Sequence, residues 1–411
     1  MMRMSNNSAP TEDRDLSASQ ASPSRIEFAN ILRGFAALSV IMFHYLAVFW
    51  TRPKVVAHLV NAPEPSPGFI VTPWPLEQFH KATLVDMGAF GVAIFFLISG
   101  FVIPFSLRKT TMAGFCVNRM FRILPTYVAG FSVTLLAIWT CSKLFGQAWP
   151  FTLSEVLVHY FPGARDMAWS RNIDGVVWTL EIEVKFYLLC ALMIPLFRRG
   201  SSITLGVPFV LACACFILAG FLPALARWNP AAYRAALALA LSGTYITYMF
   251  IGVVFHWLHQ GRLPADKAYL LAGSLFGVFC VQWYTGPFHA NFGGAWNFAW
   301  GLLAFAFAFS FQRFFRANGV FDFFANISYP LYVVHGVAGY AALRILLEYR
   351  MNPWMALGVV GVGAIGVAWL IHVLIERPGQ ALGKAWARRI DDYFGAGKAP
   401  PSDSKVAAKA A

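Results

Sequence analysis

Residues 26–50 read IEFANILRGFAALSVIMFHYLAVFW, and this apolar run decides the fold class. A helix needs about 20 largely apolar residues to cross the hydrocarbon core of a bilayer. The run is too long for the core of a signal peptide, and no small-residue cleavage site is obvious near it. We therefore expect a retained membrane span over 27–50.

The rest of the chain repeats this pattern. Of its 411 residues, 58% are apolar and only 12% are charged, whereas soluble domains are usually about a quarter charged. The predicted fold is all-α, a polytopic transmembrane helix bundle of about ten spans. The spans are expected near 27–50, 84–106, 123–141, 176–197, 203–224, 236–258, 268–285, 293–311, 327–349 and 354–375.

The ends of the chain differ from this apolar middle. Residues 1–24 are rich in Ser, Asn, Asp and Pro, which predicts a disordered tail, and residues 379–411 are expected to be a second, largely disordered tail. The membrane domain would then cover residues 25–378. Most of the 32 Lys and Arg residues fall in segments that share one side, so both termini are predicted to be cytoplasmic.

Composition also argues against several other classes of protein. The net charge of +13 is not concentrated in an apolar-poor domain, so it is better explained by basic cytoplasmic loops than by nucleic-acid binding. The six cysteines lie mostly in apolar runs and show no zinc-site spacing. We expect no disulfide framework, no metal and no bound cofactor.

Ionisable side chains inside membrane spans are costly, and they are candidates for function by default. Arg33 and His44 lie eleven residues apart, which places them on one helix face and about 16 Å apart along the axis. From spacing alone, a snorkelling arginine and a core histidine with a backbone partner explain them somewhat better. Arg119 and Arg122, just before the third predicted span, share a helix face and could bind phosphate groups, or they could be ordinary cytoplasmic charges.

The fourth predicted span carries three charges. Glu181 and Lys185 are four residues apart and could pair with each other. Glu183 points to another face, so it needs a partner from another helix, such as His44 or an arginine. In the ninth predicted span, Tyr332 and His335 could share a face, or could simply be hydrogen-bonded within the bundle.

Two further pairs that contain histidine are weaker candidates for function. His256 and His259 lie at a helix end, and His372 and Glu376 lie at the cytoplasmic edge of the last span. Neither pair has a third ligand nearby, so metal binding is not expected.

Several of these residues occur together in a known family. The chain resembles the acyltransferase 3 family of bacterial membrane proteins over nearly all of residues 25–378. The resemblance is carried by these motifs: Arg33 with His44, Phe95-Phe96-Leu97-Ile98-Ser99-Gly100-Phe101, Arg119 with Arg122, Trp178-Thr179-Leu180 with Glu183, Phe186 and Tyr187, Ser328-Tyr329 with Leu331, Tyr332 and His335, and Glu376-Arg377-Pro378. Thr179 replaces the usual serine, Pro330 follows Ser-Tyr, and Lys185 adds a charge.

The resemblance implies an enzyme of the bacterial inner membrane that moves an acyl group, with acetyl favoured, from acyl-CoA to a hydroxyl of a carbohydrate or glycoside. His44 and Glu183 would be catalytic, with Glu183 orienting His44. Arg33, Arg119, Arg122, Tyr332 and His335 would bind substrate. The acceptor, the acyl length, an acyl-histidine intermediate and the oligomeric state stay open.

A transporter or flippase without acyl chemistry is the main alternative, because proton coupling also uses buried Arg, His and Glu residues.

Overall fold

The computed structural model describes residues 26–66, 68, 71–82, 85–287, 294–315 and 319–394. The predicted N-terminal tail lies outside these residues. Every regular element within them is a helix, and no strand occurs there, so the predicted all-α class is confirmed.

Seven helical segments among the described residues are long and apolar enough to cross a membrane. They are Glu27–Thr51, Met87–Ser106 (α5), Met112–Leu144 (α6), Ile203–Trp228 (α10), Pro230–His259 (α11), Ala265–Thr285 (α12) and Pro353–Tyr393. The first contains α1 (Glu27–Phe43), a π-helical turn (His44–Val48) and α2 (Phe49–Thr51). The last contains α16 (Pro353–Ile371), a second π-helical turn (His372–Glu376) and α17 (Arg377–Tyr393).

Large apolar side chains on these helices remain exposed, as a lipid-facing surface requires. Val210, Phe221 and Val362 are each at least 60% exposed, although they lie on the apolar helices α10 and α16. Water would oppose so much exposed apolar surface, whereas hydrocarbon does not. The chain is a multi-pass membrane protein.

The predicted number of about ten spans is not confirmed exactly by the described residues. A further helix pair, α14 (Gly319–Val334) and α15 (Val337–Glu348), could make an eighth span, but it is bent by 71° at its break. The predicted fourth span is the 16-residue α8 (Val177–Leu192) followed by the short α9 (Ile194–Arg199). The predicted eighth span is the 15-residue α13 (Trp296–Ser310). These elements are too short to cross a bilayer alone.

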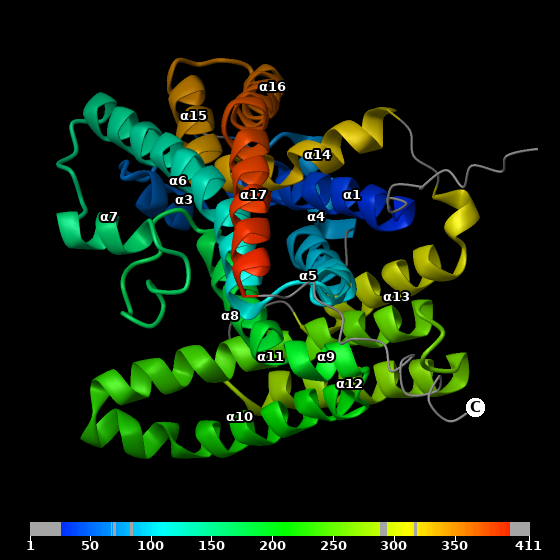
Figure 1. Cartoon of the computed structure of the whole chain (residues 1–411). Coiled ribbons are helices and arrows are strands. Elements are labelled where there is room, and N and C mark those ends of the chain that lie inside the picture. The colour runs from blue at the N-terminus through cyan, green and yellow to red at the C-terminus, as the bar shows by residue number, and fades with distance from the viewer. Residues whose placement is uncertain are drawn as a thin grey trace, which may run out of the picture.

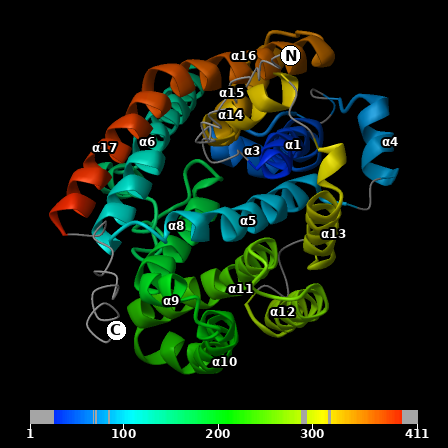
Figure 2. The same ribbon diagram turned by 45° about the vertical axis from the view of Figure 1, so that its right-hand side comes forward.

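Helix α5 forms the centre of the bundle. Helices α10 to α13 lie on one side of it, and α1, α6 and α14 to α17 lie on the other, with α8 between (Figures 1 and 2). The short helices α3 (Pro53–Val60), α4 (Trp74–Ala82) and α7 (Leu153–His159) lie outside the spans.

The C-terminal part of the chain is more regular than the sequence predicts. Helix α17 continues to Tyr393 and packs along α6, although residues 379–411 are predicted to be largely disordered. That prediction is wrong for residues 379–393, because they are helical and Gly383 lies close against Phe121 of α6. Residues 395–411 lie outside the described part of the chain.

The predicted pair between Glu181 and Lys185 is also replaced. The loop before α8 folds back, and Arg165 donates from Nε to Glu181 Oε1 at 2.7 Å and from Nη2 to Glu181 Oε2 at 2.5 Å. Lys185 pairs with Asp166 of the same loop. Glu181 and Lys185 are therefore both paired with the loop, which fixes it against the helix.

Candidate active site

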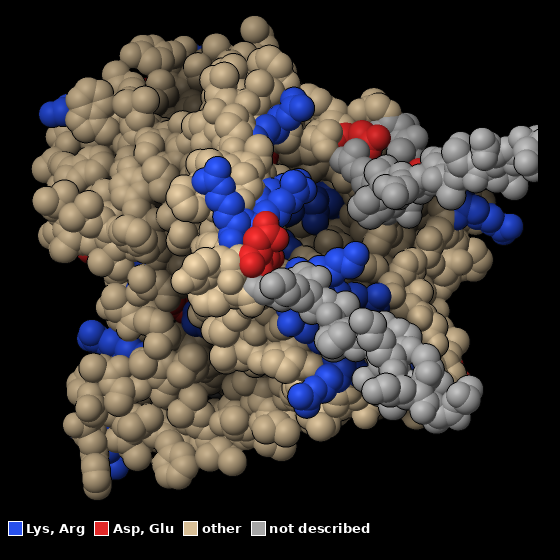
Figure 3. Space-filling view, viewed as in Figure 1, with Lys and Arg blue, Asp and Glu red and all other residues tan. Residues whose placement is uncertain are grey.

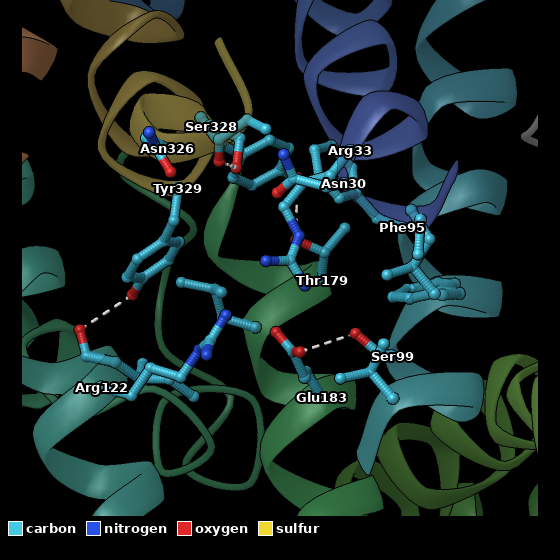
Figure 4. Close-up of a pocket in the computed structure, with 18 of the residues that line it drawn as sticks. Asn30, Arg33, Phe95, Ser99, Arg122, Thr179, Glu183, Asn326, Ser328 and Tyr329 are labelled. Atoms are coloured by element: carbon cyan, nitrogen blue, oxygen red, sulfur yellow. Dashed lines mark hydrogen bonds between the residues drawn. The ribbon is translucent and has the colours of Figure 1, made fainter. Parts of the chain in front are cut away.

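A cavity of about 350 Å³ lies where α1, α5, α6, α8, α14 and the start of α17 meet (Figure 4). Its wall is mostly apolar, with a set of polar side chains facing inward. These are Asn30, Arg33, Ser99, Arg122, Thr179, Glu183, Tyr187, Asn326, Ser328, Tyr329, Tyr332, His372, Glu376 and Gln380. A concave, largely apolar pocket with converging polar groups is typical of a small-molecule site.

Two arginines reach into this cavity from different helices. Arg33 extends from α1 and Arg122 from α6, and Figure 4 shows both pointing into the space beside Glu183. Within the described residues, neither guanidinium group makes a hydrogen bond or an ion pair. Each guanidinium offers five N–H donors. The cavity thus presents two cations whose donors are free for a ligand.

Glu183 is held in place by neighbouring hydroxyl groups. Its Oε1 accepts a hydrogen bond from Ser99 Oγ of α5 at 2.8 Å and from Tyr187 OH, one turn along α8, at 2.6 Å. His44 is not among its partners, so the predicted orientation of His44 by Glu183 is not found. The carboxylate instead lies on the floor of the cavity, where it balances part of the charge of Arg33 and Arg122.

Arg119 is not part of the cavity, although Arg122 is. Its guanidinium lies between the rings of Phe115 and Tyr187, at 5.2 and 5.3 Å from their centroids. It also donates from Nη2 to Ser106 Oγ at 2.9 Å. Residues three apart differ by about 60° around a helix, which is enough to direct the two arginines to different neighbours.

One wall of the cavity comes from the π-helical turn His372–Glu376. His372 Nδ1 lies 2.6 Å from Glu376 Oε2, and Gln380 Nε2 donates to Glu376 Oε1 at 3.0 Å. The predicted proximity of His372 and Glu376 is therefore found, but within the cavity. Short π-helical segments occur frequently at functional sites.

The other predicted residues form a second cluster farther along α1. His44 Nδ1 is hydrogen-bonded to Tyr340 OH of α15, and its ring centroid lies 4.8 Å from that of His335. Tyr332 connects the cluster to the cavity. It lines the cavity, shares a hydrogen bond with Thr179 Oγ1 at 2.8 Å, and has its ring 5.6 Å from His335.

The structure therefore divides the predicted site into two levels. Arg33, Arg122, Glu183 and Tyr332 meet in the cavity, whereas His44 and His335 meet beside it. Sequence reasoning missed Tyr340, which has no motif of its own, and it noted Ser99 and Tyr187 only as parts of longer motifs.

Basic side chains gather on one face of the molecule. Figure 3 shows Lys and Arg around the centre of the face that α17 and the α5–α6 connection share. Arg198 belongs to this region and donates to the backbone oxygen of Thr110 at 2.6 Å. These segments are the ones that the sequence places on the cytoplasmic side.

Among the described residues, no three His, Cys, Asp or Glu side chains gather closely enough to hold a metal ion.

Comparisons with known proteins agree with the predicted family. Residues 26–373 match the acyltransferase 3 family model, which is described as an acyltransferase domain. The chain is 26% identical to nodulation protein 10 of Rhizobium leguminosarum bv. viciae over 320 residues, 71% of this chain and 82% of that protein. It is also 26% identical to the acyltransferase MdmB of Streptomyces mycarofaciens over 158 residues, 36% of this chain and 40% of that protein. No solved structure matches the chain.

Proposed function

This chain belongs to the acyltransferase 3 family, and from that membership we propose that it transfers an acyl group, acetyl by preference, from cytoplasmic acyl-CoA to a hydroxyl of a carbohydrate such as exopolysaccharide or lipopolysaccharide. The enzyme is an O-acyltransferase of a membrane; the bacterial inner membrane, with both termini in the cytoplasm, is the proposed location.

The observation that carries this proposal is the pair of unpaired arginines in the cavity. CoA is an anion with several phosphate groups, and Arg binds phosphate through short, charge-assisted hydrogen bonds. Arg33 and Arg122 face a common cavity, and their donors have no partner among the residues that the structure describes. Glu183 supplies a counter-charge in the cavity, which reduces the repulsion between the two arginines.

The cluster around His44, beside the cavity, is suited to the acyl-transfer step. CoA carries its thioester at the end of a long pantetheine arm, and His44 lies about 16 Å along α1 from Arg33. Phosphate groups held near Arg33 and Arg122 would let the arm pass Tyr332 toward His44. A neutral imidazole is a suitable base for a hydroxyl group near neutral pH, and such catalysis contributes about 10²–10⁴-fold.

The relatives support the class of reaction. One of them is named an acyltransferase, and the other is named a nodulation protein. A carbohydrate acceptor follows from the family resemblance and fits the envelope setting of a multi-pass protein. The acceptor would approach the His44 end of the site, opposite the cavity.

The test is acyl transfer by membranes that contain the protein, supplied with radiolabelled acetyl-CoA and candidate glycans. Wild type should label a glycan, His44→Ala should not, and His58→Ala should label it as wild type does, because His58 is an exposed residue of α3. Absence of label with wild type across several glycans and acyl lengths would refute the acyltransferase proposal. Full labelling by His44→Ala would refute the role of His44 alone.

A further inference from the structure

Four rings form a row that leads away from the cavity. Tyr332 lines the cavity, its ring centroid lies 5.6 Å from His335, and His335 lies 4.8 Å from His44. The ring of His44 lies in turn 5.6 Å from that of Tyr340. His335 therefore stands between the wall of the donor cavity and the histidine proposed as base.

The hydrogen on the His335 ring can be placed from its contacts. Nδ1 lies 3.1 Å from the carbonyl oxygen of Leu331 and 2.8 Å from that of Tyr332. Carbonyl oxygens only accept hydrogen bonds, so Nδ1 carries the hydrogen. The lone pair of the neutral ring is then on Nε2.

That second nitrogen is buried and has no partner. His335 is fully buried, and its Nε2 makes no hydrogen bond within the described part of the chain. The hydroxyl of Tyr45, whose ring lies 6.5 Å from His335, is likewise buried and unpaired. Buried polar atoms are nearly always hydrogen-bonded in proteins. Two buried atoms near His44 without a partner among the described residues, His335 Nε2 and Tyr45 OH, therefore need an explanation.

The break between α14 and α15 explains how the orientation of the His335 ring is fixed. Helix α14 ends at Val334, and the chain turns by 71° before α15 begins at Val337. The last carbonyl groups of a helix lack their usual amide partners. The carbonyl of Leu331 already accepts from the backbone amide of His335 at 3.1 Å, and the imidazole adds a contact to it and one to the carbonyl of Tyr332. The orientation of the ring is therefore fixed by the backbone rather than by a carboxylate.

We propose that His335 is a further catalytic residue, the general acid that protonates the thiolate of CoA as it leaves. The inference rests on the proposed function. The donor enters from the cavity side, where Tyr332 and His335 lie, and the acceptor approaches His44. A proton released on the acceptor side must therefore cross to the sulfur side, and His335 lies on that path.

The step balances without any added reagent. The hydroxyl oxygen of the acceptor forms a bond to the acyl carbon while its proton goes to His44. The carbon–sulfur bond breaks, His44 passes the proton to the bare Nε2 of His335, and His335 gives it to the sulfur. Both imidazoles return to their neutral forms, and the products are the ester and free CoA.

The experiment compares two donors that bind alike but leave differently. Acetyl-CoA releases a thiolate, which needs a proton, whereas the selenoester analogue of acetyl-CoA releases a selenolate, a weaker base that leaves without one. We expect His335→Gln to lower kcat with acetyl-CoA by about 100-fold or more, with KM changed less than about threefold, and to recover most of this loss with the selenoester. His44→Gln should lose activity with both donors, because the hydroxyl proton must still be removed.

His256→Gln is the matched control. His256 is another buried histidine of a span with Nδ1 beside a backbone oxygen, that of Phe101 at 3.1 Å, and it lies outside the site. It should keep wild-type kcat with both donors. An equal loss for His335→Gln with both donors, or no loss, would overturn the proposal. If wild type itself transfers nothing from either donor, the proposed function fails and the inference fails with it.

Discussion

At the scale of the residue, two arginines one helical turn apart have separate environments. Arg122 faces the cavity and has no hydrogen-bond or ion-pair partner in the part of the chain that the structure describes, whereas Arg119 is enclosed by Phe115 and Tyr187. We expect Arg122→Ala to raise the KM for acyl-CoA by about 10- to 100-fold, the equivalent of one or two lost charge-assisted hydrogen bonds. Its thermal stability in detergent should change little.

Arg119→Ala should behave in the opposite way. It removes a cation stacked on two rings and a hydrogen bond to Ser106, so it should lower the unfolding temperature. Kinetics of acyl transfer and thermal unfolding, measured on the same preparations of both variants, would check this. A larger KM effect for Arg119→Ala than for Arg122→Ala would contradict the assignment.

A histidine outside the spans should make the stability of the protein depend on pH. His159 accepts a hydrogen bond from the Ile173 amide at Nε2, 3.0 Å, and its Nδ1 lies 2.8 Å from Tyr127 OH. Burial lowers the pKa of His159 below its usual value of about 6.5, against the opposing attraction of Asp174. The unfolded chain therefore binds this proton more readily than the folded protein does.

Stability from His159 is present above about pH 6.5 and should be lost as pH falls through 6.5 toward the lower pKa of the folded state. Unfolding temperatures measured between about pH 7 and 5 should therefore fall, and part of the fall should be missing in His159→Gln. An identical pH dependence in the variant would show that another group is responsible.

At this scale the sequence predicts which residues matter better than it predicts their partners. The cost of an ionisable group in hydrocarbon marks Arg33, Glu183 and His335 without any structure. Partners depend on packing between distant segments. Ser99 reaches Glu183 across 84 positions, and Tyr340 reaches His44 across 296, so neither contact has a local signal.

At the scale of the element, α5 and α11 cross where two glycines meet. A Cβ added to Gly100 would collide with the carbonyl oxygen of Met249, and one added to Gly252 would collide with that of Leu97. Small residues allow helix backbones to approach this closely in membranes. The crossing supports the position of Ser99, the neighbour of Gly100, beside Glu183.

Gly100→Ala should therefore force the helices apart and destabilise the protein by about 1–3 kcal/mol, the usual cost of overpacking. Transfer activity should fall as Ser99 is displaced. Gly363→Ala on α16 is the matched control, because nothing lies within 4 Å of its added Cβ. Equal thermal stability of the two variants would argue against a close crossing.

Hydropathy finds long apolar helices but not the irregular ones. The sequence predicts one span over 327–349, whereas the chain is broken beside His335, because an apolar window does not record a change of direction. The two π-helical turns of the described residues begin at His44 and His372, and the sequence gives no sign of either turn. The irregular elements that position the site residues are therefore the ones that the hydropathy pattern predicts least well.

At the scale of the whole molecule, the two levels of the site imply a direction. The cavity is lined in part by Gln380 of α17, the helix on the face where Lys and Arg gather (Figures 1 and 3). The His44 cluster lies farther along α1. With the basic face in the cytoplasm, the donor would enter from inside and the acceptor would be modified nearer the outer face.

The most direct test uses purified protein reconstituted into sealed liposomes with its cytoplasmic face outward. Labelled acetyl-CoA is supplied outside, and a membrane-impermeant glycan acceptor is enclosed within. Acyl transfer across the bilayer predicts label on the enclosed glycan with wild type and none with His44→Ala, although CoA itself stays outside. Label only when donor and acceptor share the same side would contradict the two-level account of the site.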